Sequence, residues 1–242
     1  APTTMPPRMG AGALPRTRSN HLPPDSAYEG FVVHRANEHR CGLAVAAFDL
    51  GSGYVRQEPL QRIARRLLAG LADRTRQSAH LAVLHGRDVL YVVEERAPGR
   101  PPLVTDVGVR LPAQLTASGR ARLAALPEPQ VRALYPDAGA FVDRHGTGPR
   151  TLSQLRTLLA DTRQRGFAIE EGEVTPGFAS VAAAVLDHNR HPVAGVAVTY
   201  PVEADVDVDV ARTVAATRHC AVALTRRLGG RSTTRPADPP PG

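Results

Sequence analysis

The chain has 242 residues, an apolar fraction of 42% and a formal net charge of +7 at pH 7. That length suffices for one sizeable domain with a small second unit. We find no apolar run near the roughly 20 residues of a membrane span and no apolar core of a secretory signal. We therefore expect a cytoplasmic protein with no membrane partner. All 30 basic residues are arginines scattered along the chain, so the charge favours a polyanionic partner only modestly.

The N-terminal quarter divides into two segments of different composition. Residues 1–27 are rich in proline and poor in large apolar residues, which is typical of a segment that cannot bury enough surface to become ordered. From Tyr28 a short strand at Gly30–Val33 is expected, followed by a polar turn through Arg40 and a helix that begins at Gly42. Residues 28–58 thus have the pattern of a β-wing followed by a linker helix.

The next segment predicts a helix and then a hairpin. Pro59 suits the first position of a helix, and the apolar residues that follow share one helical face. These residues are Leu60, Ile63, Ala64, Leu67, Leu68 and Leu71. Ser78–Leu84 and Val89–Glu94 are β-rich runs joined by a short turn with glycine, which predicts a β-hairpin. Leu103–Val107 is expected to be the next strand.

The stretch VGVRLPAQLTASGRARLAAL, residues 107–126, predicts a strand end that turns into a helix. Pro112 disfavours helix before it, and Thr116 is a suitable N-cap. Ala117, Ser118 and Gly119 would then form a first turn whose small side chains leave the backbone N–H groups bare, ready to receive a carboxylate or another electron-rich group. The alternative is a small-residue helix start that simply packs closely against a sheet.

The rest of the chain adds three helices and three strands. A short helix is expected near 127–135, a longer one from Thr151 or Ser153 to Arg165 with Gly166 as its C-cap, and a final one over 210–228. The strands are expected at Phe167–Glu170, Ala179–Leu186 and Val193–Tyr200, and the tail 229–242 is expected to be disordered. Hairpin strands without regular βαβ alternation predict an α+β fold with a six-stranded, mainly antiparallel sheet and flanking helices.

Catalytic and metal-binding patterns are not evident. Cys41 and Cys220 are too far apart for a disulfide framework or a metal knuckle, and His188 and His191 bracket a turn without supporting ligands. The nucleophile elbow, the phosphate-binding loop and the dinucleotide fingerprint are missing from the sequence. The acids at 170, 171 and 173 are more typical of a solvated strand end than of an acid–base pair. We therefore expect no enzyme, no metal and no cofactor.

The stretch at 107–126, followed by RQRGFAIEEGEVTPGFASVAAAVLD, resembles the effector-binding domain of the IclR family of bacterial transcription regulators. The hairpin HLAVLHGRDVLYVVEE and the later PVAGVAVTYP extend the resemblance over residues 59–228. It implies a GAF-like domain that binds a small metabolite between the sheet and the surrounding helices and loops. The implied cavity residues are Ala117, Ser118, Gly119, Glu170 and Ser180, with Leu103, Leu111 and Leu115 in the wall.

The implied ligand follows from an electrostatic conflict in this set. The helix start favours negative atoms, whereas an ionised Glu170 repels them, so we expect an organic acid or a phenolic compound that also carries a donor. A Glu170 protonated by desolvation would instead donate to a carboxylate itself. The family's usual lysine after the small-residue turn is Arg120 here, which keeps the charge but changes the geometry, and we assign Arg120 no ligand role.

The resemblance weakens at the N-terminus, where the family carries a winged helix-turn-helix. Pro23 and Pro24 fall where a recognition helix should continue, so residues 1–27 are expected to be a truncated or degenerate DNA-binding remnant. Promoter DNA is then a partner only if an intact N-terminal domain is present. The predicted helix at 42–54 is apolar around much of its circumference, which indicates a homo-oligomer, dimer or tetramer.

Two functions stay open at this point, together with the sign of regulation. The first is a ligand-responsive transcription regulator, and the second is a stand-alone metabolite-binding or dimerisation module without DNA affinity. A third alternative is a small-molecule enzyme that uses the same cavity. Operator binding would separate the first two.

Overall fold

The computed structural model describes residues 32–35, 40–43, 59–202 and 208–231. The chain divides into two compact units, residues 1–58 and residues 59–242. In the first unit, strands β1 (Val32–Arg35) and β2 (Arg40–Leu43) form an antiparallel pair. The helix expected from Gly42 is therefore wrong at its start, because Gly42 and Leu43 find their backbone hydrogen-bond partners in β1. Residues 1–31 and the remainder of that expected helix lie outside the described residues.

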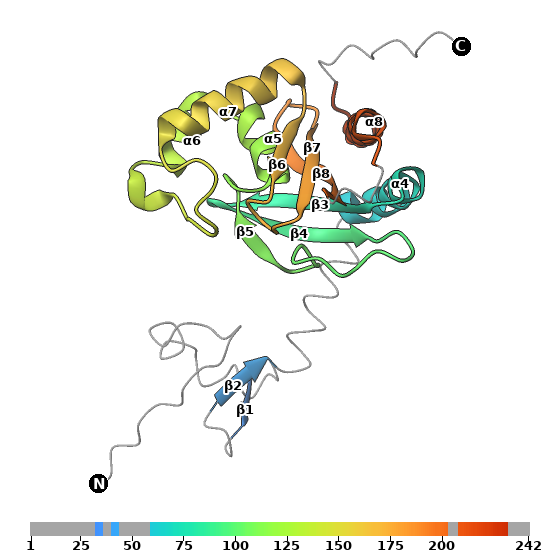
Figure 1. Cartoon of the computed structure of the whole chain (residues 1–242), viewed down its shortest axis with the longest axis horizontal. Helices are drawn as coiled ribbons and strands as arrows, with labels where there is room; N and C mark the ends of the chain where they lie inside the picture. The colour runs from blue at the N-terminus through green and yellow to red at the C-terminus, as the bar shows by residue number, and fades with distance from the viewer. Residues whose placement is uncertain (1–31, 36–39, 44–58, 203–207, 232–242) are drawn as a thin grey trace. The chain divides into compact units, whose positions relative to one another are not determined.

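The second unit is built on one curved sheet of six strands, all antiparallel to their neighbours, in the order β5-β4-β3-β8-β7-β6 (Figure 1). The predicted α+β class and the predicted six-stranded sheet are confirmed. The strands are β3 (Ser78–His85), β4 (Asp88–Glu95), β5 (Arg110–Pro112), β6 (Ala168–Glu171), β7 (Phe178–Leu186) and β8 (Pro192–Pro201).

One predicted strand is misplaced. The expected strand at Leu103–Val107 is wrong: residues 96–109 form a connecting loop, and β5 begins only at Arg110. Pro101 and Pro102 have no N–H group to donate to a ladder, and Gly108 takes a left-handed turn conformation at φ 88°. Pairing with β4 resumes after that turn, where the Tyr91 N–H donates to the carbonyl of Val109.

Helices cover both faces of the sheet (Figure 1). The helices α4 (Pro59–Thr75) and α8 (Val210–Arg227) pack with one face in a core cluster that includes Leu68, Leu81 and Leu224. The opposite face carries α5 (Ala117–Ala125) and α7 (Leu152–Arg165), with α6 (Glu128–Leu134) and the 3₁₀ turn Ala138–Ala140 at their side. No helix among the described residues is long and apolar enough to cross a membrane.

Two glycines let α5 lie directly on the sheet. A Cβ on Gly119 would overlap the backbone of Ala113, and a Cβ on Gly195 of β8 would lie 2.7 Å from the carbonyl oxygen of Ser118. Neither position therefore has room for a side chain. The first turn of α5 is consequently held against β8, with its backbone close to the strands that carry Glu170 and Ser180.

Candidate functional site

The first turn of α5 has the capping geometry that its sequence predicts. Thr116 is extended at φ −97° and ψ 145°, and its hydroxyl oxygen accepts a hydrogen bond from the N–H of Gly119 at 3.0 Å. The Thr116 N-cap is therefore confirmed. Within the described residues, the backbone N–H groups of Ala117 and Ser118 have no hydrogen-bond partner. These two amides and the positive end of the helix dipole make this turn a suitable place for a hydrogen-bond acceptor.

A small cavity lies beside this turn, enclosed by the sheet and by the loop between β4 and β5. Its volume is about 10 Å³, room for roughly one water molecule. Its lining comes from α5, four strands and two loops, which are far apart in the sequence. The lining residues are Tyr91, Leu103, Thr105, Thr116, Ala117, Ser118, Glu170, Val174, Thr175, Phe178, Ser180, Ala197 and Thr199.

The polar side chains of the cavity form an incomplete hydrogen-bond network. Ser180 Oγ lies 2.8 Å from Glu170 Oε1 and 2.9 Å from Thr199 Oγ1. The cross-strand register explains the group, because Ser180 of β7 lies opposite both Glu170 of β6 and Thr199 of β8. Ser118, by contrast, is 1% exposed and its hydroxyl makes no hydrogen bond of good geometry among the described residues, although it lies close enough to the Tyr91 phenol to lower the pKa of that phenol. A buried hydroxyl without a partner is unfavourable, so a ligand or a water that supplies one would be stabilised here.

Burial changes the protonation of this network. Desolvation, reinforced by the negative charge of Glu173, raises the pKa of the Glu170 carboxyl from its ordinary 4.5 to about 7, against the hydrogen bond from Ser180. Burial and the nearby Glu170 carboxylate also raise the pKa of the Tyr91 phenol. Near neutral pH the site therefore offers a neutral phenol and a carboxyl group that can act as donor or acceptor.

Arg120 lies outside the cavity and links the segments that form its wall. Its guanidinium donates to the carbonyls of Gln114 and Ile169, at 2.8 Å each, and to Glu173 Oε1 at 2.7 Å. The side chain is 3% exposed and is not part of the cavity lining. It ties the segment before α5 to β6 through these three contacts.

The structure brings five of the eight sequence-predicted site residues to this cavity: Ala117, Ser118, Glu170, Ser180 and Leu103. Gly119 instead faces the backbone of Ala113, where its missing side chain serves packing. Leu111 and Leu115 belong to the core cluster beneath α5 and α7. The contacts of Gly119, Leu111 and Leu115 therefore fit the alternative in which the start of the helix packs closely against the sheet.

Sequence reasoning missed several lining residues, chiefly Tyr91, Thr105 and Thr199. Thr105 lies in a loop whose composition predicts a strand, so the sequence does not indicate that it reaches the cavity. Thr199 could have been found by aligning the polar positions of the last two predicted strands. The interpretation of residues 170, 171 and 173 as a solvated strand end is wrong for Glu170, which is 3% exposed, whereas Glu171 is exposed. Among the described residues, no group of three or more His, Cys, Asp or Glu side chains could hold a metal ion.

The comparisons with known proteins agree with this architecture. The family model described as "Bacterial transcriptional regulator IclR C-terminal" matches residues 52–226. Because that match spans well over half of the chain, this protein belongs to the IclR family of bacterial transcriptional regulators, and residues 52–226 contain the family's C-terminal effector domain. IclR-family regulators bind small-molecule effectors and form oligomers.

Individual relatives extend the similarity beyond that domain. The glycerol operon regulatory protein of Streptomyces coelicolor is 34% identical over 203 residues, covering 83% of this chain and 79% of that protein. The transcriptional repressor IclR of Escherichia coli is 26% identical over 219 residues, covering 90% and 80%. The crystal structure of the Agobacterium tumefaciens repressor BlcR superposes with a TM-score of 0.64 at 25% identity, covering 90% of this chain and 86% of that one.

Proposed function

We propose that the cavity beside α5 is the effector site of this regulator and that its effector is a small organic acid or a phenolic compound. The observation that carries the proposal is the hydroxyl of Ser118, which among the described residues is buried without a hydrogen bond of good geometry, next to two backbone amides that also have no partner there. A ligand acceptor at this point would satisfy donors that the protein leaves unpaired. The positive end of α5 favours an acceptor that carries negative charge.

Glu170 selects what the rest of the effector carries. With a pKa of about 7, the protonated carboxyl group donates to a ligand carboxylate, and the ionised group accepts from a ligand hydroxyl. A carboxylate ligand would therefore take up a proton with it, whereas a phenol would not. The hydroxyls of Ser180 and Thr199, already bonded to Glu170 or to each other, fix the position of this carboxyl group.

The loop between β4 and β5 is the part of the wall that would move to admit the effector. The cavity of about 10 Å³ is too small for an organic acid. This loop contributes Leu103 and Thr105 to the lining, while Val104 and Val107 on its outer side are 43% and 45% exposed. Its packing is thus one-sided, and displacing it uncovers less apolar surface than displacing a strand.

Thermal stabilisation by a panel of small carboxylic acids and phenols tests the proposal. A ligand that binds the folded chain raises the melting temperature. Ser118→Leu fills the cavity and should abolish the shift, Ser118→Ala should weaken it, and Glu170→Gln should change which ligands stabilise. Ser153→Leu, on the exposed side of α7, is the matched control. If a ligand stabilises the parent and all four variants equally, its site lies elsewhere.

At the level of the whole chain, we propose a cytoplasmic homo-oligomeric regulator with the segment 59–228 as effector-binding domain. Residues 28–58 would be the wing and linker, residues 1–27 a DNA-binding remnant, and residues 229–242 a tail. Promoter DNA would be bound where an intact N-terminal reader is present. Titration of a promoter fragment beside a scrambled one, at fixed salt, separates this function from a stand-alone metabolite-binding module, which would show no sequence preference.

A further inference from the structure

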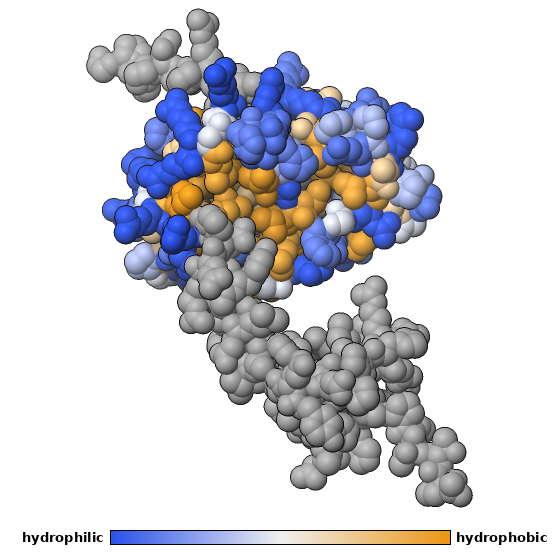
Figure 2. Space-filling model, turned by 180° about the vertical axis from the view of Figure 1, so that it is seen from behind, coloured by the Kyte–Doolittle hydropathy of each residue, from blue (hydrophilic) through white to orange (hydrophobic). Residues whose placement is uncertain are grey.

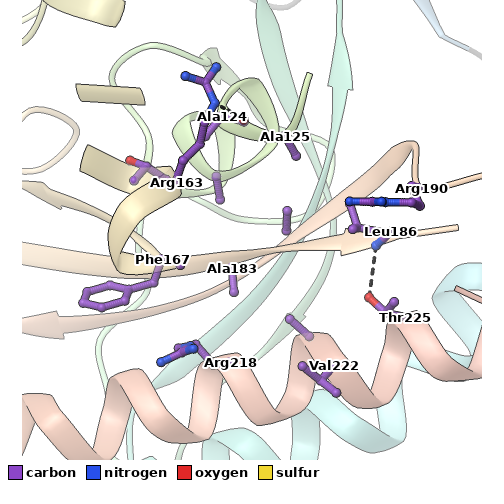
Figure 3. Close-up of a pocket in the computed structure, with 15 residues that line it drawn as sticks. Ala124, Ala125, Arg163, Phe167, Ala183, Leu186, Arg190, Arg218, Val222 and Thr225 are labelled. Carbon is purple, nitrogen blue, oxygen red and sulfur yellow. Dashed lines mark hydrogen bonds between the residues drawn. The ribbon is translucent and has the colours of Figure 1, made fainter. Parts of the chain in front are cut away.

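A second and larger pocket lies along the C-terminal half of α5, whereas the effector cavity lies beside its first turn. It has a volume of about 360 Å³ and is bordered by α5, the end of α7, the edge of β7 and α8 (Figure 3). Its lining shares no residue with the effector cavity. Six of the lining residues are alanines, whose small side chains leave this space open, and we call them the floor of the pocket. The floor alanines are Ala121, Ala124, Ala125, Ala183, Ala184 and Ala221.

The pocket wraps around an unpaired strand edge. β6 pairs with β7 only as far as Ala182, so within the described part of the chain no strand lies beside Ala183 to Val185 on that side. Both Ala183 and Ala184 line the pocket, although successive side chains point to opposite faces of a sheet. Thr225 of α8 closes the end of this edge, because its hydroxyl accepts from the N–H of Leu186 at 3.0 Å. The open edge is thus about three residues long.

The charges around the pocket are all positive. Arg163, Arg190 and Arg218 are in its lining, which contains no acidic residue. Arg163 donates to the carbonyl of Ala124, whereas Arg190 and Arg218 lie at opposite ends of the pocket in Figure 3. Among the described residues neither of these two forms an ion pair. An arginine without a carboxylate partner can pair with an anion.

The backbone conformation of Arg190 determines where its side chain starts. Arg190 has a positive φ of 62°, which is uncommon for a residue that is not glycine, asparagine or aspartate. The turn that imposes this conformation is closed by the hydrogen bond from the Arg190 N–H to the carbonyl of Asp187. The side chain starts from this turn at the rim of the pocket, where it is exposed.

From this arrangement we infer that the pocket between α5, α7, α8 and the edge of β7 is a second ligand site, for an organic acid with a planar apolar body. The carboxylate would pair with the half-buried Arg218, and the body would lie against the alanine floor and Phe167. The volume is within the range of pockets that bind small organic molecules. The inference does not depend on the effector cavity, because the two sites share no residue.

Calorimetric titration of the full chain at low salt with 2-naphthoate, a planar aromatic carboxylate, tests the inference. One molecule should bind per chain, and the uncharged 2-naphthamide should bind at least about tenfold more weakly. Arg218→Gln should weaken 2-naphthoate by about tenfold, since it removes a charged hydrogen bond, and Arg190→Gln, at the other end of the pocket, should weaken it less. Val222→Trp, from the α8 wall, should abolish binding by occupying the pocket.

Two control variants distinguish binding in this pocket from general attraction to a basic surface and from binding in the effector cavity. Arg212→Gln removes an exposed charge from the same helix outside the pocket, and Ser118→Leu fills the effector cavity. Both should leave the affinity for 2-naphthoate unchanged, and the melting temperature of each variant shows that it is folded. The inference is overturned if 2-naphthoate does not bind at millimolar concentration, if Arg212→Gln weakens it as much as Arg218→Gln, or if Ser118→Leu alone abolishes binding.

Discussion

Glu170 carries a buried carboxyl group whose surroundings disfavour its ionised form. It is 3% exposed, it faces the charge of Glu173, and its pKa is raised from 4.5 to about 7. The sequence placed it in the site through the family resemblance, but the same three acids also suggested a solvated strand end. Only the burial of Glu170 distinguishes a site residue from a solvated strand end. That burial depends on β7 and on the segment after β6, and no local sequence pattern reveals it.

The raised pKa predicts a pH-dependent stability. The folded state binds the Glu170 proton more tightly than the unfolded state, so the stability should fall as the pH rises from about 4.5 to about 7 and then stay level, by up to roughly 3 kcal/mol. Glu170→Gln, whose amide oxygen still accepts from Ser180, should remove this slope. Urea unfolding at pH 5, 6, 7 and 8 measures it. Equal slopes in the parent and in Glu170→Gln would contradict the assignment.

Arg120 carries a second prediction at this scale. Its guanidinium uses three separate donors on Gln114, Ile169 and Glu173, whereas the point-like ammonium of lysine cannot reach three acceptors in that geometry. Arg120→Lys should therefore destabilise the fold by roughly 1 to 2 kcal/mol, and Arg120→Ala, which leaves Glu173 without its partner, by about 3 to 5 kcal/mol. Urea midpoints measure both. The exposed Arg132→Lys serves as control and should change little.

At the scale of the elements, the contact between α5 and β8 sets the position of the cavity that we propose as the effector site. Gly195 has no room for a Cβ, because the carbonyl oxygen of Ser118 would lie 2.7 Å away. Gly195→Ala should push the first turn of α5 off the sheet, destabilise the protein by about 1 to 3 kcal/mol, and weaken effector binding more than substitutions in distant core positions do.

Gly70→Ala is the matched control for that substitution. Gly70 lies inside α4, and an added Cβ would meet only the end of the Arg74 side chain at an ordinary 3.5 Å. Alanine is the better helix former, so this variant should be more stable by about 0.5 to 1 kcal/mol. We expect the change in stability, measured by thermal or urea unfolding, to have opposite signs in the two glycine variants. A stabilising Gly195→Ala would show that α5 does not need this close approach.

Most helices and strands of the second unit could be predicted because their signals are local. The apolar face after Pro59, the glycine at 166 and the hairpin turn at 86 each identify an element without knowledge of the rest of the chain. The loop at 96–109 could not, because its valines have a strand-like composition and only the prolines and Gly108 oppose a strand. The pairing of Ser180 with Thr199 and the 360 Å³ pocket depend on register and on helix placement, which are long-range properties.

At the scale of the whole molecule, the surface carries apolar area that one copy leaves uncovered. Figure 2 shows a continuous apolar region bordered by hydrophilic side chains on one face. Half-buried apolar residues at the edge of the core, such as Leu60, Ile63 and Leu67 of α4, also have only part of their surface covered. Exposed apolar patches of this kind mark interaction surfaces in regulators that form oligomers.

The sequence from Ala44 to Val55 adds a separate reason to expect self-association, and with it the last prediction. It carries Val45, Phe48 and Leu50 within a stretch that is rich in alanine, and as a helix it would have apolar residues around much of its circumference. A second copy of the chain is the partner that would cover them. Light scattering at tens of micromolar should therefore give a mass of two or four times 25.8 kDa. Phe48→Glu, which places a charge inside that contact, should lower the mass toward a single chain, whereas Asp49→Glu, which keeps the charge of the next residue, should leave it unchanged. A parent chain that scatters as a monomer at these concentrations would refute the oligomer, and a Phe48→Glu variant with the parent's mass would move the contact to the apolar face of the second unit.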